Sequence, residues 1–233
     1  FNLLTCLSFR RSFAIRAVIM LVLLQLLGGI FSGYLTKLAI NWVDIENFQL
    51  KTQNILLECF GGILWVWAFQ NLPIQEATLF SLVSTIIIGI GLVDFYTFQI
   101  PLVFILAGFL VVAVAVILNV IFISVAFWGV IVGAVIPLLI MGAVWIITKR
   151  QGMGYGDIQM GIVLGAWLGP IRMALTLFGA SVLSLITWIA VSLIHDFNKD
   201  RALPLAPFLA IAGIGIYVGS FYYPELFHLL IIK

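Results

Sequence analysis

The chain has 233 residues, of which 64% are hydrophobic and only 9% are charged, whereas a soluble domain carries about 25% charged residues. Its net charge of +2 argues against nucleic-acid binding, which requires a strongly basic surface. The two cysteines, Cys6 and Cys59, are too far apart in the sequence to form a Cys-x-x-Cys motif, and we expect no metal site. This composition predicts an all-α, polytopic integral membrane protein whose surroundings are the lipid bilayer.

A membrane-spanning helix needs about 20 apolar residues, and several segments of the chain approach or exceed that length. In chain order, we expect about eight membrane helices, at residues 17–40, 55–69, 77–93, two within 101–148, 157–168, 171–194 and 206–222. The stretch 101–148 is too long for one span, and polar residues near 119–124 indicate where it divides. The chain is therefore divided into an N-terminal segment with the first helix, 1–54, and a helical core, 55–233.

Two aspartates lie at the ends of these apolar segments. Asp94 follows the third predicted helix, and Asp157 begins the sixth, directly after Gly154 and Gly156. A carboxylate at the centre of a bilayer costs about 2.5–3.5 kcal/mol on insertion scales, so an acid within the membrane is a candidate functional residue. Two predicted helices separate the aspartates, so we expect both at the same face of the membrane.

The basic residues indicate which face this is, because cytoplasmic loops carry an excess of lysine and arginine. With eight spans, six basic residues share the face of the aspartates: Lys37, Lys51, Lys149, Arg150, Lys199 and Arg201. Three arginines near the start of the chain fall on the opposite face, unless residues 1–16 lie along the interface or follow a further segment: Arg10, Arg11 and Arg16. The pattern favours the cytoplasmic face for the aspartates.

A pair of carboxyl groups can hydrolyse a peptide bond without a metal ion. Two carboxyl groups within hydrogen-bond distance do not both ionise easily, so one keeps its proton while the other stays charged. The charged group can activate a water molecule while the protonated group donates to the carbonyl oxygen. Gly154 and Gly156 would allow unusual dihedral angles and the close approach of an extended peptide beside Asp157.

Each acid could instead have a role outside catalysis. Asp94 could reach interfacial water from a helix end, and Asp157 could be a helix N-cap residue. Acids within spans also mark ion routes, so an ion-coupled transporter is an alternative, although the sequence lacks the symmetric halves typical of one. An assembly scaffold without activity is another. Glu58 could line the site, lie at the interface, or pair with Lys37 or Lys51.

Four segments around the aspartates occur in an order that is typical of a known family. They are Gly152-Met153-Gly154-Tyr155-Gly156-Asp157, Asp94 followed by Ile100-Pro101, Gly165-Ala166-Trp167-Leu168-Gly169, and Pro204-Leu205-Ala206-Pro207-Phe208-Leu209-Ala210. In these segments the chain resembles the type IV prepilin peptidases, also called prepilin leader peptidases, which are Gly-x-Gly-Asp intramembrane aspartyl proteases. The resemblance covers about residues 55–213, and Glu58 lies where that family often has a glutamate.

The resemblance implies an endopeptidase of the bacterial cytoplasmic (inner) membrane that removes the leader peptide of type IV prepilins or pseudopilins at the cytoplasmic face. Asp94 and Asp157 carry over as the catalytic pair. The residues expected to bind substrate or to shape the site are Gly154, Gly156, Glu58 and Pro101. Peptide cleavage is expected to need no cofactor. A related Gly-x-Gly-Asp protease with a different membrane substrate is the alternative.

The chain departs from the family pattern in several places. It lacks the paired Cys-x-x-Cys motifs of many bacterial members, and the polar stretch 41–54 is too short for the domain that carries them. Those members also methylate the new amino terminus with S-adenosylmethionine, so this cofactor is expected only if methylation is retained. Gln159 stands where the family often has lysine, Leu102 where it often has a polar residue, and Ala206 where it has glycine.

Overall fold

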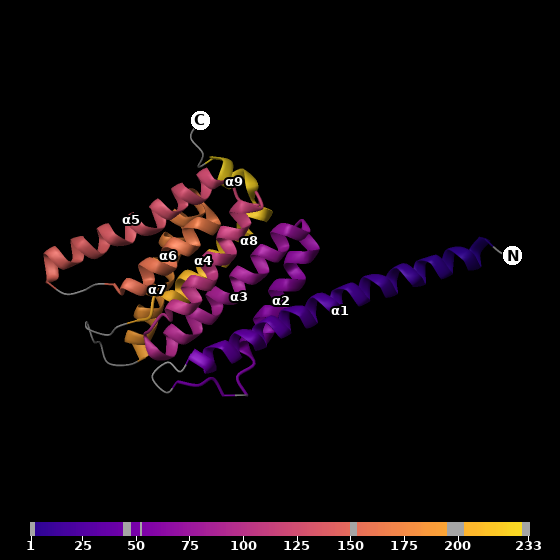
Figure 1. Ribbon diagram of the computed structural model, residues 1–233, viewed down its shortest axis with the longest axis horizontal. Helices are drawn as coiled ribbons and strands as arrows, with labels where there is room; N and C mark the ends of the chain where they lie inside the picture. The colour runs from indigo at the N-terminus through magenta and orange to yellow at the C-terminus, as the bar shows by residue number, and fades with distance from the viewer. Residues whose placement is uncertain (1–2, 44–47, 52, 150–152, 195–202, 230–233) are drawn as a thin grey trace.

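Nine helices form from the part of the chain that the computed structural model describes, which is residues 3–43, 48–51, 53–149, 153–194 and 203–229. They are α1 (Leu3–Val43), α2 (Leu56–Asn71), α3 (Ile74–Thr97), α4 (Leu102–Ile117), α5 (Ile123–Thr148), α6 (Tyr155–Leu168), α7 (Pro170–Ile194), α8 (Ala206–Tyr222) and α9 (Pro224–Leu229). In Figure 1 the helices pack side by side, and the N-terminal part of α1 projects from the bundle. The predicted all-α class is confirmed.

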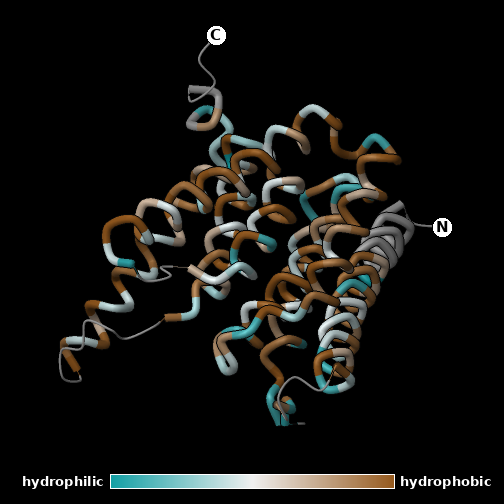
Figure 2. The backbone as a smooth tube through the Cα atoms, turned by 60° about the vertical axis from the view of Figure 1, so that its left-hand side comes forward, coloured by the Kyte–Doolittle hydropathy of each residue, from teal (hydrophilic) through white to brown (hydrophobic). Residues whose placement is uncertain are grey.

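The outer surface of this bundle is apolar. Among the described residues, four helices are long and apolar enough to cross a membrane: Arg16–Val43 of α1, and α3, α5 and α7. Figure 2 shows hydrophobic residues along most of the tube, and side chains such as Leu24 and Leu185 are each 57% exposed. Such a surface requires lipid around it, so the polytopic membrane class is also confirmed.

The predicted segments correspond to α1–α8, with differences in length. Helices α4 and α8 are shorter apolar helices, and α2 and α6 have only 16 and 14 residues, fewer than the about 20 that cross a bilayer. Helix α1 begins at Leu3 instead of near residue 17, because residues 3–16 contain no glycine or proline that would end a helix. Helix α9 directly follows α8.

The connections on either side of α4 follow from local chemistry. Helix α3 continues past Asp94 to Thr97, so the aspartate lies within the last turn, and Phe98 ends the helix in a left-handed conformation with φ of 55°. Pro101 is the N-cap residue of α4, a place where its missing N–H is not needed. Asn119, with φ of 57°, lies in the predicted break between α4 and α5, and asparagine tolerates this left-handed region better than most residues.

Helices α5 and α6 approach each other closely through four glycines. A Cβ atom added to Gly129 on α5 would overlap the carbonyl oxygen of Gly165 on α6, and one added to Gly133 would overlap that of Gly161. Small residues spaced four apart let the backbones of membrane helices come into contact, and van der Waals packing then stabilises the pair. This contact fixes α6, and with it Asp157, against α5.

Replacement of Gly165 by valine should therefore destabilise the protein. The new side chain meets the backbone of Gly129, which cannot give way as a flexible side chain would, and overpacking of this kind costs about 1–3 kcal/mol. The melting temperature of the detergent-solubilised variant measures the effect. Gly142→Val on α5 is the matched control, since a Cβ at Gly142 meets nothing within 4 Å. Equal melting temperatures for the two variants would contradict the α5–α6 contact.

Candidate active site

Asp94 is held in place by the beginning of α8. Its side chain lies in the last turn of α3, and the residue is only 5% exposed. The backbone N–H of Ala206 donates a hydrogen bond to Oδ2 of Asp94, with 3.2 Å between nitrogen and oxygen. The two helices meet closely here, because a Cβ added to Gly91 would lie 3.1 Å from Cα of Pro207. The start of α8 therefore orients one oxygen of the buried carboxyl group.

Asp157 is oriented by the backbone at the beginning of its own helix. It is the third residue of α6, and the backbone N–H of Gly154, the N-cap residue, donates to Oδ2 of Asp157 over 3.2 Å. Asp157 is therefore not the N-cap residue itself; it reaches back from the first turn, where an acid is favourable. The residue is partly exposed.

The two aspartates lie at the same end of the bundle. Asp157 is close enough to Asp94 for an electrostatic interaction between their side chains. The residue before Asp157 also contacts the connection after α3, because a Cβ on Gly156 would lie 2.8 Å from Cβ of Ile100. The chain therefore brings together two acids that are 63 positions apart in the sequence.

The unusual dihedral angles expected at the two glycines of the motif are not found. Gly154 has φ of −76° and ψ of 149°, an extended conformation that other residues adopt readily, so it needs no unusual dihedral angle. Gly156 is required for close packing, since any side chain there would strike Ile100. Pro101, which is buried, follows Ile100 and accepts a hydrogen bond from the N–H of Phe104 at 3.1 Å. Pro101 thus shapes the connection that lies against α6.

Glu58 belongs to a different cluster. Its carboxylate forms an ion pair with the ammonium group of Lys37 on α1, which also donates to the backbone oxygen of Asn54 over 2.8 Å. Lys37 is only 4% exposed, whereas Lys51, the other partner considered, is exposed. The ion pair joins α1 to the first turn of α2, and it stabilises the contact between these helices.

Some expected features fall outside the described residues: Gly152 of the glycine motif, and the basic residues Arg150, Lys199 and Arg201. Within the part of the chain that the structure describes, no three His, Cys, Asp or Glu side chains are grouped as a metal site would require. The sequence does not predict the hydrogen bond from Ala206 to Asp94. Its donor is a backbone N–H, which every residue except proline has. The four conspicuous segments nevertheless include both partners.

Fold and site together define a polytopic helical membrane protein with two carboxyl groups at one end of its bundle. Residues 79–189, which include both aspartates, match the Type IV leader peptidase family. The resemblance to type IV prepilin peptidases is therefore confirmed over this segment. Glu58 and the start of α8 lie outside it.

Similar proteins agree with this result. The prepilin leader peptidase/N-methyltransferase of Pseudomonas putida is 35% identical over 103 residues, which are 42% of this chain and 36% of that protein. The proteins of the same name from Dichelobacter nodosus and Aeromonas salmonicida (strain A449) are 37% and 32% identical over 87 residues, each 36% of this chain and 29% and 30% of the relative. The matched part of the chain thus spans about a third of these relatives. No solved structure matches the chain.

Proposed function

We propose that this chain is an intramembrane aspartyl endopeptidase that removes the leader peptide from type IV prepilins or pseudopilins. The observation that carries the proposal is the pairing of Asp94 with Asp157 at one end of the bundle, within the segment that matches the leader peptidase family. An acid within a membrane protein is costly, and two such acids that interact electrostatically are suited to hydrolysis by a shared-proton mechanism once they share a substrate.

In this mechanism one carboxylate takes a proton from a water molecule, and the water oxygen attacks the carbonyl carbon of the scissile peptide bond. The other carboxyl group, which is protonated, donates its proton to the carbonyl oxygen. When the tetrahedral intermediate collapses, the C–N bond breaks, the leaving amine takes up the proton that the first carboxylate received from water, and the second carboxylate takes a proton back from the hydroxyl group of the intermediate. The backbone N–H groups of Ala206 and Gly154 each fix one carboxyl oxygen without adding charge to the site.

We place the reaction at the cytoplasmic face of the bacterial inner membrane. The argument comes from the basic residues, since Lys149 is the C-cap residue of α5 and Lys37 lies six residues before the end of α1, towards connections on the predicted cytoplasmic side. Asp94 and Asp157 lie at the ends of α3 and α6 on the same side. A leader that leaves the bilayer on this side would reach the pair near the membrane surface.

The test is co-expression of the chain with a type IV prepilin in cells that lack their own leader peptidase. The mass of the pilin subunit measures whether the leader has been removed. We expect release with the wild type and none with the double variant Asp94→Ala/Asp157→Ala. Equal release by both proteins would overturn the proposal, because it would place the hydrolysis outside this pair. Absence of release with the wild type and several prepilins would also count against it.

We further propose that cleavage needs no cofactor. Water and two carboxyl groups are sufficient for the hydrolysis, so the purified protein should release the leader equally with and without S-adenosylmethionine. The names of the relatives include an N-methyltransferase, and this chain lacks the Cys-x-x-Cys motifs of many members. We expect no labelled methyl group on the new amino terminus when labelled S-adenosylmethionine is added to the same reaction. Label on the mature pilin would contradict this expectation.

A further inference from the structure

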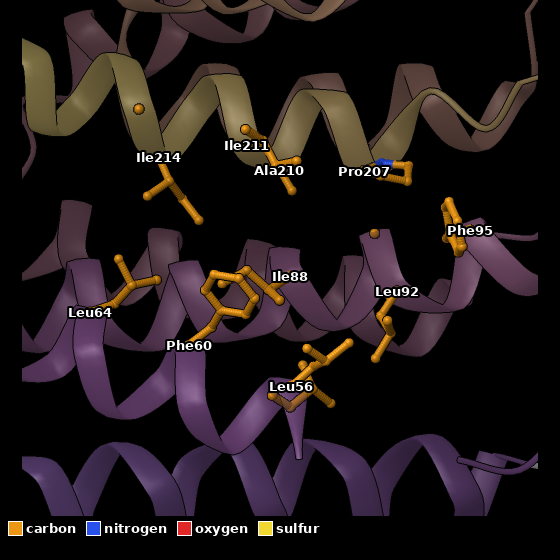
Figure 3. Close-up of a pocket in the computed structure, with 13 residues that line it drawn as sticks. Leu56, Phe60, Leu64, Ile88, Leu92, Phe95, Pro207, Ala210, Ile211 and Ile214 are labelled. Atoms are coloured by element: carbon orange, nitrogen blue, oxygen red, sulfur yellow. The ribbon is translucent and has the colours of Figure 1, made fainter. Parts of the chain in front are cut away.

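An apolar groove opens on the bundle near the end of α3 that carries Asp94, and Figure 3 shows the side chains that line it. Helices α2, α3 and α8 form its walls, and it encloses about 380 Å³. In the close-up, Phe95 and Pro207 lie at one end, and Leu64 and Ile214 lie at the other. All the residues that line the groove are apolar, so its occupant must be apolar along its length.

One end of the groove is built by the same residues that hold Asp94. Gly91, Leu92 and Phe95 line the groove and lie within one turn of Asp94 on α3. On the opposite wall, the lining residue Pro207 directly follows Ala206, whose N–H donates to the carboxylate. The groove and the carboxyl group of Asp94 therefore share the same stretches of α3 and α8.

The length and polarity of the groove select a helical occupant. Its α8 wall runs from Pro207 to Gly215, which at 1.5 Å per residue is about 12 Å, or two turns of helix. An extended peptide in such a groove would leave backbone N–H and C=O groups without partners, each at a cost of several kcal/mol. A helix satisfies these groups internally and presents only side chains to the walls.

The groove is accessible from the lipid, and it allows close approach of a second helix. Phe60 on α2 and Ile211 on α8 line it and are 50% and 62% exposed. The α8 wall also carries Gly215, and small residues allow helices to pack closely in membranes. A Cβ added to Gly215 would meet nothing within 4 Å, so the space in front of it is open.

We propose that this groove binds the apolar helix of the substrate that adjoins the scissile bond, and that the helix enters sideways from the bilayer between α2 and α8. The inference rests on the proposed function, and it assigns substrate selection to the helix as well as to the leader. Apolar side chains over about two helical turns next to the cleaved bond would match the walls of the groove.

A side chain that fills the groove without disturbing the fold tests this proposal. Gly215→Phe places a ring in the open space, and Gly219→Phe, one turn further along α8, is the matched control because its Cβ also meets nothing within 4 Å. For a full-length prepilin in detergent, we expect Gly215→Phe to lower kcat/KM by about tenfold or more, mainly through KM. The control should stay within about twofold of the wild type.

Each outcome of this comparison is decisive. Equal cleavage by the two variants would overturn the groove proposal while leaving the proposed function intact. If the wild type itself cleaves no prepilin, the proposed function fails instead. The melting temperatures of the two variants are compared with that of the wild type. Similar values mean that a loss of activity in Gly215→Phe does not come from unfolding.

Disulfide trapping provides a second test that does not depend on catalysis. Ile211→Cys is introduced into a protein with Cys6→Ser and Cys59→Ser, together with Asp94→Asn so that the prepilin stays uncut. The prepilin carries one cysteine within two turns after its cleavage site. We expect a cross-link at Ile211 but not at Leu185→Cys on α7, which is similarly exposed, 57% against 62%. Equal cross-linking at both positions, or none at Ile211, would assign the groove to lipid chains and contradict the proposal.

Discussion

Asp94→Asn and Asp157→Asn should each reduce leader cleavage by about 100- to 10,000-fold, the range that a general acid or base contributes. Asparagine has nearly the shape of aspartate, and its amide oxygen can still accept the hydrogen bond from Ala206 or Gly154. It cannot take a proton from water or donate one as a carboxyl group does. The rate of leader release by the purified variants, measured against a fixed amount of prepilin, gives the loss.

The double variant separates a true pair from two independent acids. If the carboxyl groups act as a unit, Asp94→Asn/Asp157→Asn should be no slower than the slower single variant. If each acid contributes independently, the two losses multiply. Thr97→Val serves as the control on the same turn of α3, since its hydroxyl donates to the carbonyl of Val93, and it should cleave at close to the wild-type rate.

Glu58→Gln should lower the stability of the protein by about 3–5 kcal/mol, because it leaves the buried ammonium group of Lys37 without its carboxylate. Chemical unfolding in detergent measures the loss. The double variant Lys37→Met/Glu58→Leu should recover most of it, since apolar side chains can replace a buried ion pair at little cost. Lys51→Met is the control, because Lys51 is exposed, and it should unfold like the wild type.

The activity of Glu58→Gln tests whether the ion pair of Lys37 and Glu58 is separate from the two aspartates. Glu58 binds Lys37 instead of contacting the aspartates, so the folded fraction of Glu58→Gln should cleave prepilin at close to the wild-type rate per molecule. A loss of several hundredfold in properly folded protein would place Glu58 in the reaction and contradict its assignment to the α1–α2 contact.

Hydropathy was sufficient to predict most of the helices. Apolar runs bounded by polar residues gave α2, α4, α7 and α8 to within a few residues, and Asn119 indicated the break between α4 and α5. Helix ends were harder, because residues such as Tyr96 and Thr97 are compatible with either a helix or a loop. The tertiary contacts of α6 decide its packing, and they depend on glycines whose partners are more than 25 positions away.

For the candidate site, the sequence predicted which residues take part but not which of them come into contact. Two acids beside glycines are visible in a sequence, and so is a glutamate within an apolar segment. The choice of Lys37 over Lys51 for Glu58 depended on which lysine becomes buried. The groove could not be predicted, because it exists only where α2, α3 and α8 meet and because all its residues resemble ordinary membrane-facing side chains.

The bond from Ala206 to Asp94 has a consequence for how this position can change in evolution. The family pattern has glycine there, and this chain has alanine, yet the contact with the carboxylate is made by the backbone N–H. Every amino acid except proline supplies that donor. Residue 206 is fully buried, so only a small side chain fits there. Glycine and alanine both fit, and either one can donate the hydrogen bond to Asp94. Proline is the one small residue that should not be found at this position in an active relative.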